Sequence, residues 1–545
     1  MRQRLSFPSC AIWFAAGMLL AAGIARAAPD AAQLAALANG SNDEKIAALR
    51  DLGAQADAAS LPVLAALSEG SLYAFKTDSG WRVLLLKASG EAVDAASGER
   101  LLSLPEGADS VMINNRVRGA LAAALAAIRL ASADVEMRLE AIATLGNAPD
   151  VKFLPLLDAA LRRESNENVK TRIETVRAVI LLQNGQREDR LMAIRILGET
   201  SDPAHLRLLR PFLTKDGQGR FVETDTRIRA AARQAAREIE SRVQTGEMLK
   251  RVFEGISLGS ILLLAALGLA IAYGLMGVIN MAHGELVMIG AYAAYVTQTL
   301  VQQHAPAFFD VWLLAAIPVS FFAAAFAGFL MERLVIRHLY GRPLETLLAT
   351  WGISLMLIQG VRAFFGAQNV TVENPSWLSG GVEIIGKQIL TYNRIALIVF
   401  AALVLAGVVV LLAGTRMGLF VRAVTQNRAI ARCMGVSTGY VDSMTFGFGA
   451  GLAGLAGCAL SQIGNVGPEL GQGYIVDSFM VVVLGGVGQI AGTVYAALGL
   501  GILNKFIEAF AGAVLAKIAI LLMIVIFIQK RPQGIFALKG RYADI

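Results

Sequence analysis

Two glycine-rich segments of this 545-residue sequence partly match known nucleotide-binding motifs. Residues 381–388 match a phosphate-binding loop except at the last position, where Gln388 replaces the Ser or Thr that would hold Mg²⁺. Residues 449–454 have the spacing of a dinucleotide-binding loop, but they lie in an apolar stretch, where small residues usually serve close helix packing. HExxH and CxxC motifs do not occur. We therefore expect no catalytic residue, metal site, bound cofactor or ATPase site in this chain.

Six polar residues at or near the ends of apolar stretches could form hydrogen bonds with a solute. Hydrogen-bonding groups are costly in an apolar segment, so they are candidates for contact with a polar solute. Titratable groups are scarce in the middle of these stretches, which argues against proton coupling. The candidates for a solute path are Asn280, His283, Glu285, Gln462, Asn465 and Glu469.

Composition predicts what kind of structure must position these residues. Hydrophobic residues make up 55% of the chain, more than one water-soluble domain usually carries. The chain has 49 Lys and Arg and 42 Asp and Glu residues, and only 28 of these follow position 251. The sequence therefore divides into a hydrophilic N-terminal half and an integral membrane half. The net charge of +7 does not indicate nucleic-acid binding, because the arginines form no dense basic tract.

The beginning of the chain predicts export. Arg2 and Arg4 precede an apolar run over residues 11–24, and small residues then surround a cleavage site after Ala27. The apolar run is shorter than the roughly 20 residues of a membrane-spanning helix. We therefore expect a cleavable signal peptide at 1–27 and a periplasmic domain at 28–245.

Three similar segments, at 45–53, 138–146 and 190–198, indicate repeats in that domain. Each has apolar residues at helical spacing and ends in a glycine, which is typical of a helix that stops in a left-handed conformation. A second apolar run follows each one, so we expect stacked helical hairpins that resemble HEAT repeats. Residues 73–86 predict a small inserted β-hairpin. The domain is expected to be a docking or regulatory surface, or a passive spacer.

The second half, at 252–540, predicts an all-α, polytopic membrane domain. Eight simple spans would leave the C-terminal basic residues outside, whereas basic segments belong in the cytoplasm. We expect Gly485, Gly486 and Gly488 to break the seventh stretch into two short elements, which gives eight or nine spans and a cytoplasmic C-terminus. The candidate spans are 256–279, 282–302, 311–332, 346–363, 391–414, 443–462, 476–509 and 512–529.

The membrane half also resembles a known family in specific residues. Residues 258–260, 266–269 and 273–285 are similar to the opening signature of the permeases of branched-chain amino-acid ABC importers. Together with the exported domain, residues 465–472, 476–480 and 530–540 resemble the B-type permease of the urea-importer branch. Further matching segments are 341–343, 423–432, 434–436, 451–457, 482–488 and 531–534.

This resemblance implies a permease subunit that carries urea across the inner membrane and is not itself an enzyme. Besides the lipid bilayer, it implies three kinds of protein partner: a second homologous permease, two cytoplasmic ABC ATPase subunits that use ATP, and a periplasmic urea-binding protein. The loop 415–441 would contact the ATPases, because residues 420–424 and 427–434 can form short amphipathic helices. Alternatively, its arginines only anchor the loop at the inner surface. The coupling residues are expected to be Arg422, Gln426, Asn427, Arg428, Ala429, Arg432 and Gly435.

Three other functions stay open from the sequence. A permease for branched-chain or other amino acids would need half-helix N-termini and a charged partner for the zwitterion. A urea or amide channel would need no ATP, but the coupling-type loop argues against it. A sensor that transmits binding through the helical array ranks last.

Overall fold

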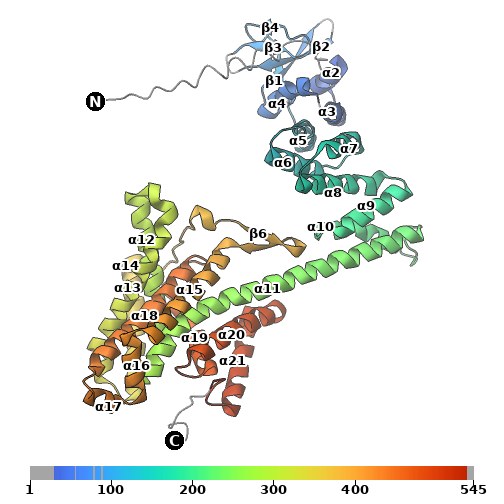
Figure 1. Ribbon diagram of the computed structural model, residues 1–545. Coiled ribbons are helices and arrows are strands. Elements are labelled where there is room, and N and C mark those ends of the chain that lie inside the picture. The colour runs from blue at the N-terminus through green and yellow to red at the C-terminus, as the bar shows by residue number, and fades with distance from the viewer. Residues whose placement is uncertain (1–29, 56, 78–79, 88–89, 537–545) are drawn as a thin grey trace, which may run out of the picture. The chain divides into compact units, whose positions relative to one another are not determined.

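The computed structural model describes residues 30–55, 57–77, 80–87 and 90–536. The predicted signal peptide lies outside the described residues, as do Lys539 and Arg541. The chain is mostly helical and forms two compact units, one up to Glu240 and one from Ser241 onward (Figure 1).

The first unit consists of helices around a small sheet. Helices α2 (Ala31–Asn39), α3 (Asn42–Gln55) and α4 (Leu61–Glu69) precede the strands. After the strands come α5 (Asn115–Arg129), α6 (Val135–Asn147), α7 (Leu154–Arg163), α8 (Glu167–Asn184), α9 (Arg187–Glu199) and α10 (Ala204–Leu209). The three repeated segments lie in α3, α6 and α9, which are helices as predicted. The resemblance of these segments to HEAT repeats and the export of the first unit stay predictions.

The glycines that end the repeated segments have a different role from the one expected. Gly53, Gly146 and Gly198 lie inside their helices, and none has a positive φ. A Cβ at Gly53 would collide with the backbone of Ala124 in α5, and one at Gly198 would collide with Ala235. The prediction of left-handed helix ends is therefore wrong. Gly53 and Gly198 are needed because neighbouring helices approach too closely for a side chain.

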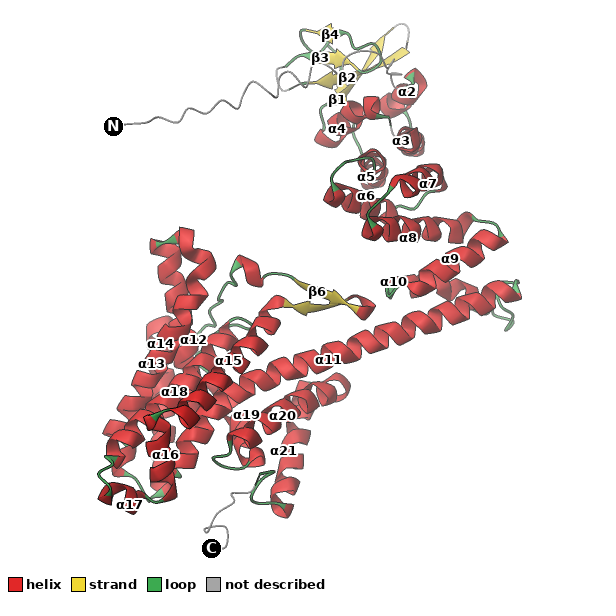
Figure 2. Cartoon of the chain, in the orientation of Figure 1, coloured by secondary structure: helices red, strands yellow, loops and turns green. Residues whose placement is uncertain are grey.

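The predicted β-hairpin is confirmed, but it belongs to a larger sheet. Strands β1 (Leu72–Thr77) and β2 (Gly80–Leu86) are antiparallel, with Leu72 opposite Leu85. Figure 2 shows these strands beside β3 (Ala92–Asp94), β4 (Arg100–Leu101) and β5 (Asp109–Ser110), in the order β4-β3-β2-β1-β5. The added strands have only two or three residues, too few to show the alternating pattern that reveals a strand in a sequence.

One ion pair in this unit leads to a pH-dependent prediction. Arg138 donates to both oxygens of Glu164, at 2.9 and 3.1 Å, and both side chains are largely buried. The backbone N–H of Asn166, followed by Arg138, holds the pKa of Glu164 below its usual value. A lowered folded-state pKa stabilises the fold above the unfolded pKa of about 4.3, and this stabilisation is lost as the pH falls through the folded-state pKa.

We expect Glu164→Gln to lower the free energy of unfolding by about 1–3 kcal/mol at pH 7, because a charged hydrogen bond is lost from a buried site. The difference from the wild type should shrink toward pH 3.5. Thermal unfolding of the full chain at both pH values measures it. Glu167→Gln is the control, since Glu167 is exposed. Equal melting temperatures for the two variants at pH 7 would contradict the prediction.

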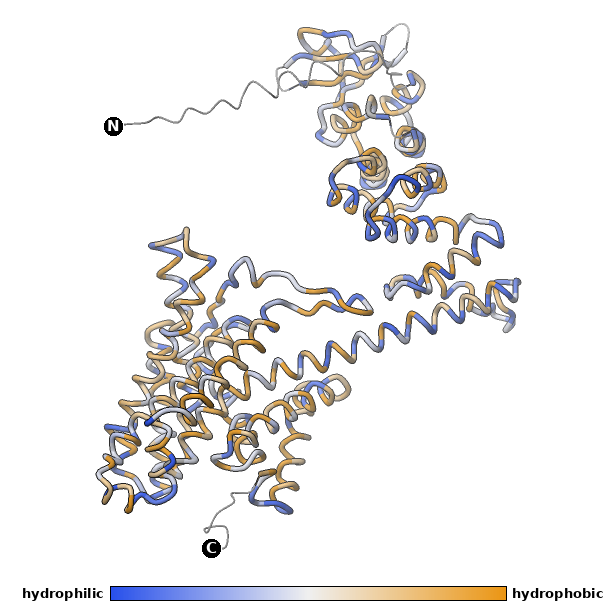
Figure 3. The backbone as a smooth tube through the Cα atoms, in the orientation of Figure 1, coloured by the Kyte–Doolittle hydropathy of each residue, from blue (hydrophilic) through white to orange (hydrophobic). Residues whose placement is uncertain are grey.

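Helix α11 (Thr226–Met276) continues from the first unit into the second. The predicted start of the first span, residue 256, therefore falls inside a 51-residue helix. Hydrophobic residues predominate along the helices of the second unit (Figure 3). These helices are α12 (His283–His304), α13 (Trp312–Leu334), α14 (Pro343–Phe365), α15 (Tyr392–Gly414), α16 (Arg416–Gln426), α17 (Arg428–Cys433), α18 (Thr438–Ser461), α19 (Leu470–Gly485), α20 (Ile490–Ala511) and α21 (Ala513–Lys530).

Seven helices of the described chain are long and apolar enough to cross a membrane: α11, α13, α14, α15, α18, α20 and α21. The shorter apolar helix α19 has 16 residues. The predicted break of the seventh stretch is confirmed, because α19 ends at Gly485 and both Gly486 and Gly488 have a positive φ. The pieces differ from those expected, since α19 starts at Leu470 and α20 is a full 22 residues long.

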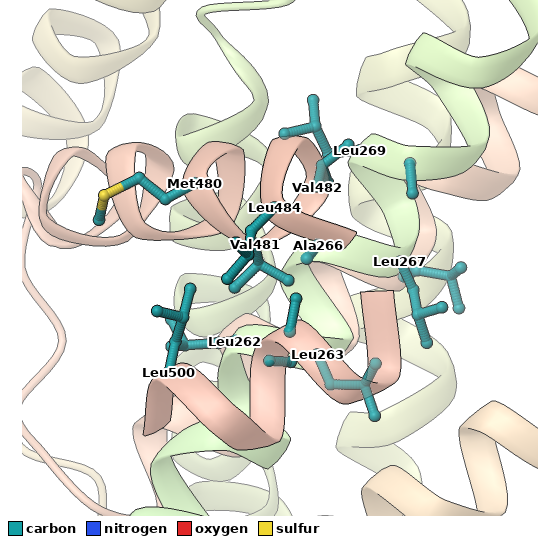
Figure 4. Packing of buried hydrophobic residues seen from close by; sticks show 14 of the residues in the cluster. Leu262, Leu263, Ala266, Leu267, Leu269, Met480, Val481, Val482, Leu484 and Leu500 are labelled. Carbon is teal, nitrogen blue, oxygen red and sulfur yellow. The ribbon is translucent and has the colours of Figure 1, made fainter. Parts of the chain in front are cut away.

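Apolar contacts and close glycine contacts hold the second unit together. Leu262, Leu263 and Ala266 of α11 pack with Val481 of α19 and Leu500 of α20 (Figure 4). The segment 449–454 lies inside α18, where a Cβ on any of its three glycines would collide with a neighbouring helix. This confirms the packing role that the sequence indicates.

The segment that resembles a phosphate-binding loop forms a β-hairpin. Strand β6 (Gly381–Ile384) pairs with β7 (Gln388–Thr391), and no helix follows the turn between them. This is not the strand-loop-helix arrangement that binds a phosphate.

Candidate functional site

The connection between α11 and α12 folds back into the helix bundle. His283 Nε2 donates a 3.0 Å hydrogen bond to the carbonyl of Ala265, and a Cβ at Gly268 would also contact the ring of His283. Ala265 and Gly268 precede the end of α11 at Met276 by about two to three helical turns. The N-terminus of α12 therefore lies in the interior of the unit.

A second helix begins at the same place. The backbones of Gly284 in α12 and Gly471 in α19 approach so closely that neither residue has room for a side chain. Both lie within the first two residues of their helices. Helix N-termini carry a partial positive charge and unpaired N–H groups, so two of them converge within the bundle.

Helix α14 lines the α11–α12 turn with hydroxyl groups. Thr346, Thr350 and Ser354 are buried and spaced by four residues, so they share one face. Thr350 Oγ1 accepts a 3.2 Å hydrogen bond from the N–H of Met281. Ser354 Oγ donates a 2.8 Å hydrogen bond to Glu285 Oε1. Thr350 and Ser354 were not among the residues predicted from the sequence, although hydroxyl residues four apart in an apolar helix are a usable signal.

Two polar atoms of the turn have no hydrogen-bond partner among the described residues. Asn280 is 3% exposed and Glu285 is 1% exposed. Asn280 Oδ1 accepts the N–H of Ala282 at 3.0 Å, but its Nδ2 donor is unpaired, and so is the acceptor Glu285 Oε2. The turn therefore offers a solute one donor and one acceptor, both shielded from water.

The other three candidates lie on a separate segment, the connection 462–469 between α18 and α19. Gln462 is buried and its Oε1 has no partner among the described residues, whereas Asn465 is exposed. Glu469 forms an ion pair with Arg362 of α14. No hydrogen bond in the described chain joins this set to the turn at 280–285.

His283 contacts the α11 carbonyl, which favours a structural role for it.

The predicted coupling loop forms the two short helices expected, α16 and α17. Asn427 lies between them, and its Oδ1 accepts the N–H of Ile430 at 3.0 Å, which begins α17. Arg428 forms an ion pair with Asp442 of α18, and Arg432 Nε donates to Thr438 Oγ1 at 3.1 Å. The exposed residues of the loop include Arg422, Gln426, Ala429, Gly435, Leu419, Phe420, Ile430 and Met434.

Comparison with known proteins assigns the second unit to a family. Residues 251–528 match the family model described as the permease component of the branched-chain amino acid transport system. This match covers more than half of the chain. The chain belongs to this family. It is thus a multi-pass membrane transport component, and the family level of the sequence-based resemblance is confirmed.

The permease is similar to curated relatives over their nearly complete length. It is 28% identical to the high-affinity branched-chain amino acid transport permease BraD of Pseudomonas aeruginosa, over 53% of this chain and 95% of that protein. It is 30% identical to LivH of Salmonella typhimurium, over 53% of this chain and 94% of that protein. A shorter similarity, 34% over 98 residues, links it to the ribose import permease RbsC of Escherichia coli, over 17% of this chain and 30% of that protein. No solved structure matches the chain.

Proposed function

We propose that this permease is the membrane subunit of an ATP-driven importer of urea in the bacterial inner membrane. Partner ATPase subunits would hydrolyse ATP, a periplasmic binding protein would deliver urea, and a second permease would complete the path. The assignment to urea is supported by the resemblance of residues 465–472, 476–480 and 530–540 to the urea-importer branch.

The observation that carries the proposal is the polarity of the α11–α12 turn. Urea donates through two NH₂ groups and accepts through one carbonyl oxygen, so its site needs both acceptors and donors. Glu285 Oε2 is an acceptor and Asn280 Nδ2 is a donor, and both are buried and unpaired among the described residues. Unpaired buried groups are costly, and a solute that pairs with both would remove that cost.

A basic face of the second unit supports the proposed orientation. The backbone of Gly274, near the end of α11, packs against Gly488 in the α19–α20 break, and the N–H of Ile535 donates to Leu484 at 2.8 Å. Tyr340 Oη lies 3.2 Å from Met276 Sδ. These contacts place the ends of α11, α13, α19 and α21 at one face, which would be cytoplasmic by the positive-inside rule. Its basic residues include Arg333, Arg337, Arg342, Lys530 and Arg531.

The opposite face would be periplasmic. Gly246 of α11 packs against Ile385 in the β6–β7 hairpin, so α11 enters the second unit beside this hairpin. The chain before residue 241 would therefore lie in the periplasm, as the signal-like start of the sequence predicts.

Transport of branched-chain amino acids is the second candidate. The relatives BraD and LivH are named for that activity. The N-termini of α12 and α19, which meet at Gly284 and Gly471, could bind a carboxylate, while Glu285 could bind an ammonium group. Both features suit a zwitterion.

Uptake measurements distinguish these functions. Labelled urea and labelled leucine are supplied separately at low concentration to cells with and without the gene, with a parallel ATP-depleted sample. We expect deletion to abolish ATP-dependent urea uptake, and excess leucine not to compete. Loss of leucine uptake alone would refute urea, and uptake that survives ATP depletion would indicate a channel.

A further inference from the structure

A partly buried cluster of charged and hydroxyl groups joins the coupling loop to the membrane helices. Glu332 lies in α13, Asp442 and Ser443 lie in α18, and Tyr340 lies between α13 and α14. Arg428, at the start of α17, completes the cluster. Glu332 is 1% exposed and Asp442 is fully buried, so both acids depend on protein partners.

Each carboxyl oxygen of Glu332 has one hydrogen-bond donor. Tyr340 Oη donates to Glu332 Oε1 at 2.8 Å, and Ser443 Oγ donates to Glu332 Oε2. Burial and the bond to Glu332 raise the pKa of Tyr340, so the hydroxyl keeps its proton and remains a donor. These two bonds hold the carboxyl group of Glu332 between Tyr340 and Ser443.

Asp442 has one ion-pair partner among the described residues, and Arg432 adds a weaker attraction from farther away. Arg428 contacts Asp442 Oδ2, while Oδ1 has no hydrogen-bond partner among the described residues. The guanidinium of Arg428 also lies over the Tyr340 ring, 5.1 Å from its centroid. Removal of Arg428 would leave the buried Asp442 without its ion-pair partner, which disfavours the present arrangement.

The cluster reaches the end of α11. The Tyr340 hydroxyl that bonds Glu332 lies 3.2 Å from the sulfur of Met276. Met276 is the last residue of α11, and the turn with Asn280 and Glu285 begins directly after it. Arg428 is thereby linked to Met276 by two consecutive contacts through Tyr340, and the turn that holds the candidate solute site follows Met276 in the chain.

We propose that Arg428 is a positioning residue that ties the coupling loop to the α11–α12 turn, and that it does not dock the ATPase. A movement of α17 would then shift Asp442 and Tyr340 together, and with them the end of α11. Exposed residues such as Arg422 on α16 would then contact the ATPase. The inference rests on the proposed function as an ATP-driven importer, and it does not depend on which solute is carried.

The test uses the whole importer, purified with its ATPase subunits and reconstituted in vesicles. The variants are Arg428→Ala, Arg428→Lys and the exchange Arg428→Asp with Asp442→Arg, and the control is Arg422→Ala. Three quantities are measured: ATPase subunits retained on purification, ATP hydrolysed, and labelled urea or leucine accumulated per ATP. The solute is whichever of the two the wild type accumulates.

We expect Arg428→Ala to retain the ATPase subunits and hydrolyse ATP, but to accumulate at least tenfold less solute per ATP. Arg428→Lys and the charge exchange should recover part of the loss, and Arg422→Ala should instead lose ATPase subunits. The proposal is overturned if Arg428→Ala loses ATPase subunits as Arg422→Ala does, or accumulates solute normally. It is also overturned if neither Arg428→Lys nor the charge exchange recovers any function. A wild-type importer that accumulates leucine and not urea would refute the assignment to urea and leave this comparison intact.

Discussion

Glu285→Ala is expected to lower solute uptake at least tenfold without lowering the amount of permease in the membrane. Glu285 supplies the one unpaired carboxylate oxygen at the buried α11–α12 turn. A site that binds a solute through hydrogen bonds loses about 1–3 kcal/mol when an acceptor is removed, because the solute donor is then left unpaired. Initial uptake rates of labelled urea and leucine, normalised to membrane-inserted protein, measure the effect.

Related variants distinguish the roles of the two carboxyl oxygens of Glu285. Glu285→Gln keeps an oxygen for Ser354 but replaces the free acceptor with an NH₂ donor, so we expect nearly the same loss as for alanine. Ser354→Ala removes only the 2.8 Å orienting bond, and a loss of severalfold is expected. Glu345→Gln is the matched control, because Glu345 is exposed on α14. Normal uptake by Glu285→Gln would exclude Glu285 as an acceptor for the solute.

Gly290→Leu should prevent the second unit from folding. A Cβ at Gly290 of α12 would collide with the backbone of Gly454 in α18, so even a methyl group at position 290 would overlap the other helix. The leucine can be accommodated only by separation of the helices, and we expect a cost above about 4 kcal/mol. The measurements are the yield of protease-resistant protein in the membrane and its monodispersity after extraction.

The control for this variant is Gly407→Leu in α15. A Cβ at Gly407 meets nothing, and the residue is exposed on the surface of the helix. We expect Gly407→Leu to retain the wild-type yield. If both leucine variants accumulate equally, the close α12–α18 contact does not control folding.

Several features of the fold could be predicted because they depend on local sequence. The break after Gly485, the short helices α16 and α17, and the β1–β2 hairpin all follow from residues adjacent in the chain. The repeated glycines at 53, 146 and 198 show the limit of such reasoning. A glycine near the end of a helical segment has the same local pattern whether it ends the helix or lies against another helix, and only the neighbour, such as Ala124, decides between the two.

The candidate site was predicted only in part. Asn280 and Glu285 were found because polar residues in an apolar stretch are conspicuous. Ser354 was missed because its role depends on Glu285, which is 69 residues away in the chain. Arg428 was identified as an ATPase contact because an arginine in a basic loop has the same appearance whether it is free or paired. Its ion pair with Asp442 exists only because α17 folds against α18.

The sequence by itself determined that this protein is a membrane permease, where most of its helices lie, and which polar residues are unusual. These properties follow from hydropathy, helical spacing and residue identity, which are present before the chain folds. Only the tertiary structure decided that the α11–α12 turn enters the bundle, that α12 and α19 begin side by side, and which acid each arginine neutralises. Such features arise from contacts between residues far apart in the chain, and their energies depend on the burial that folding creates.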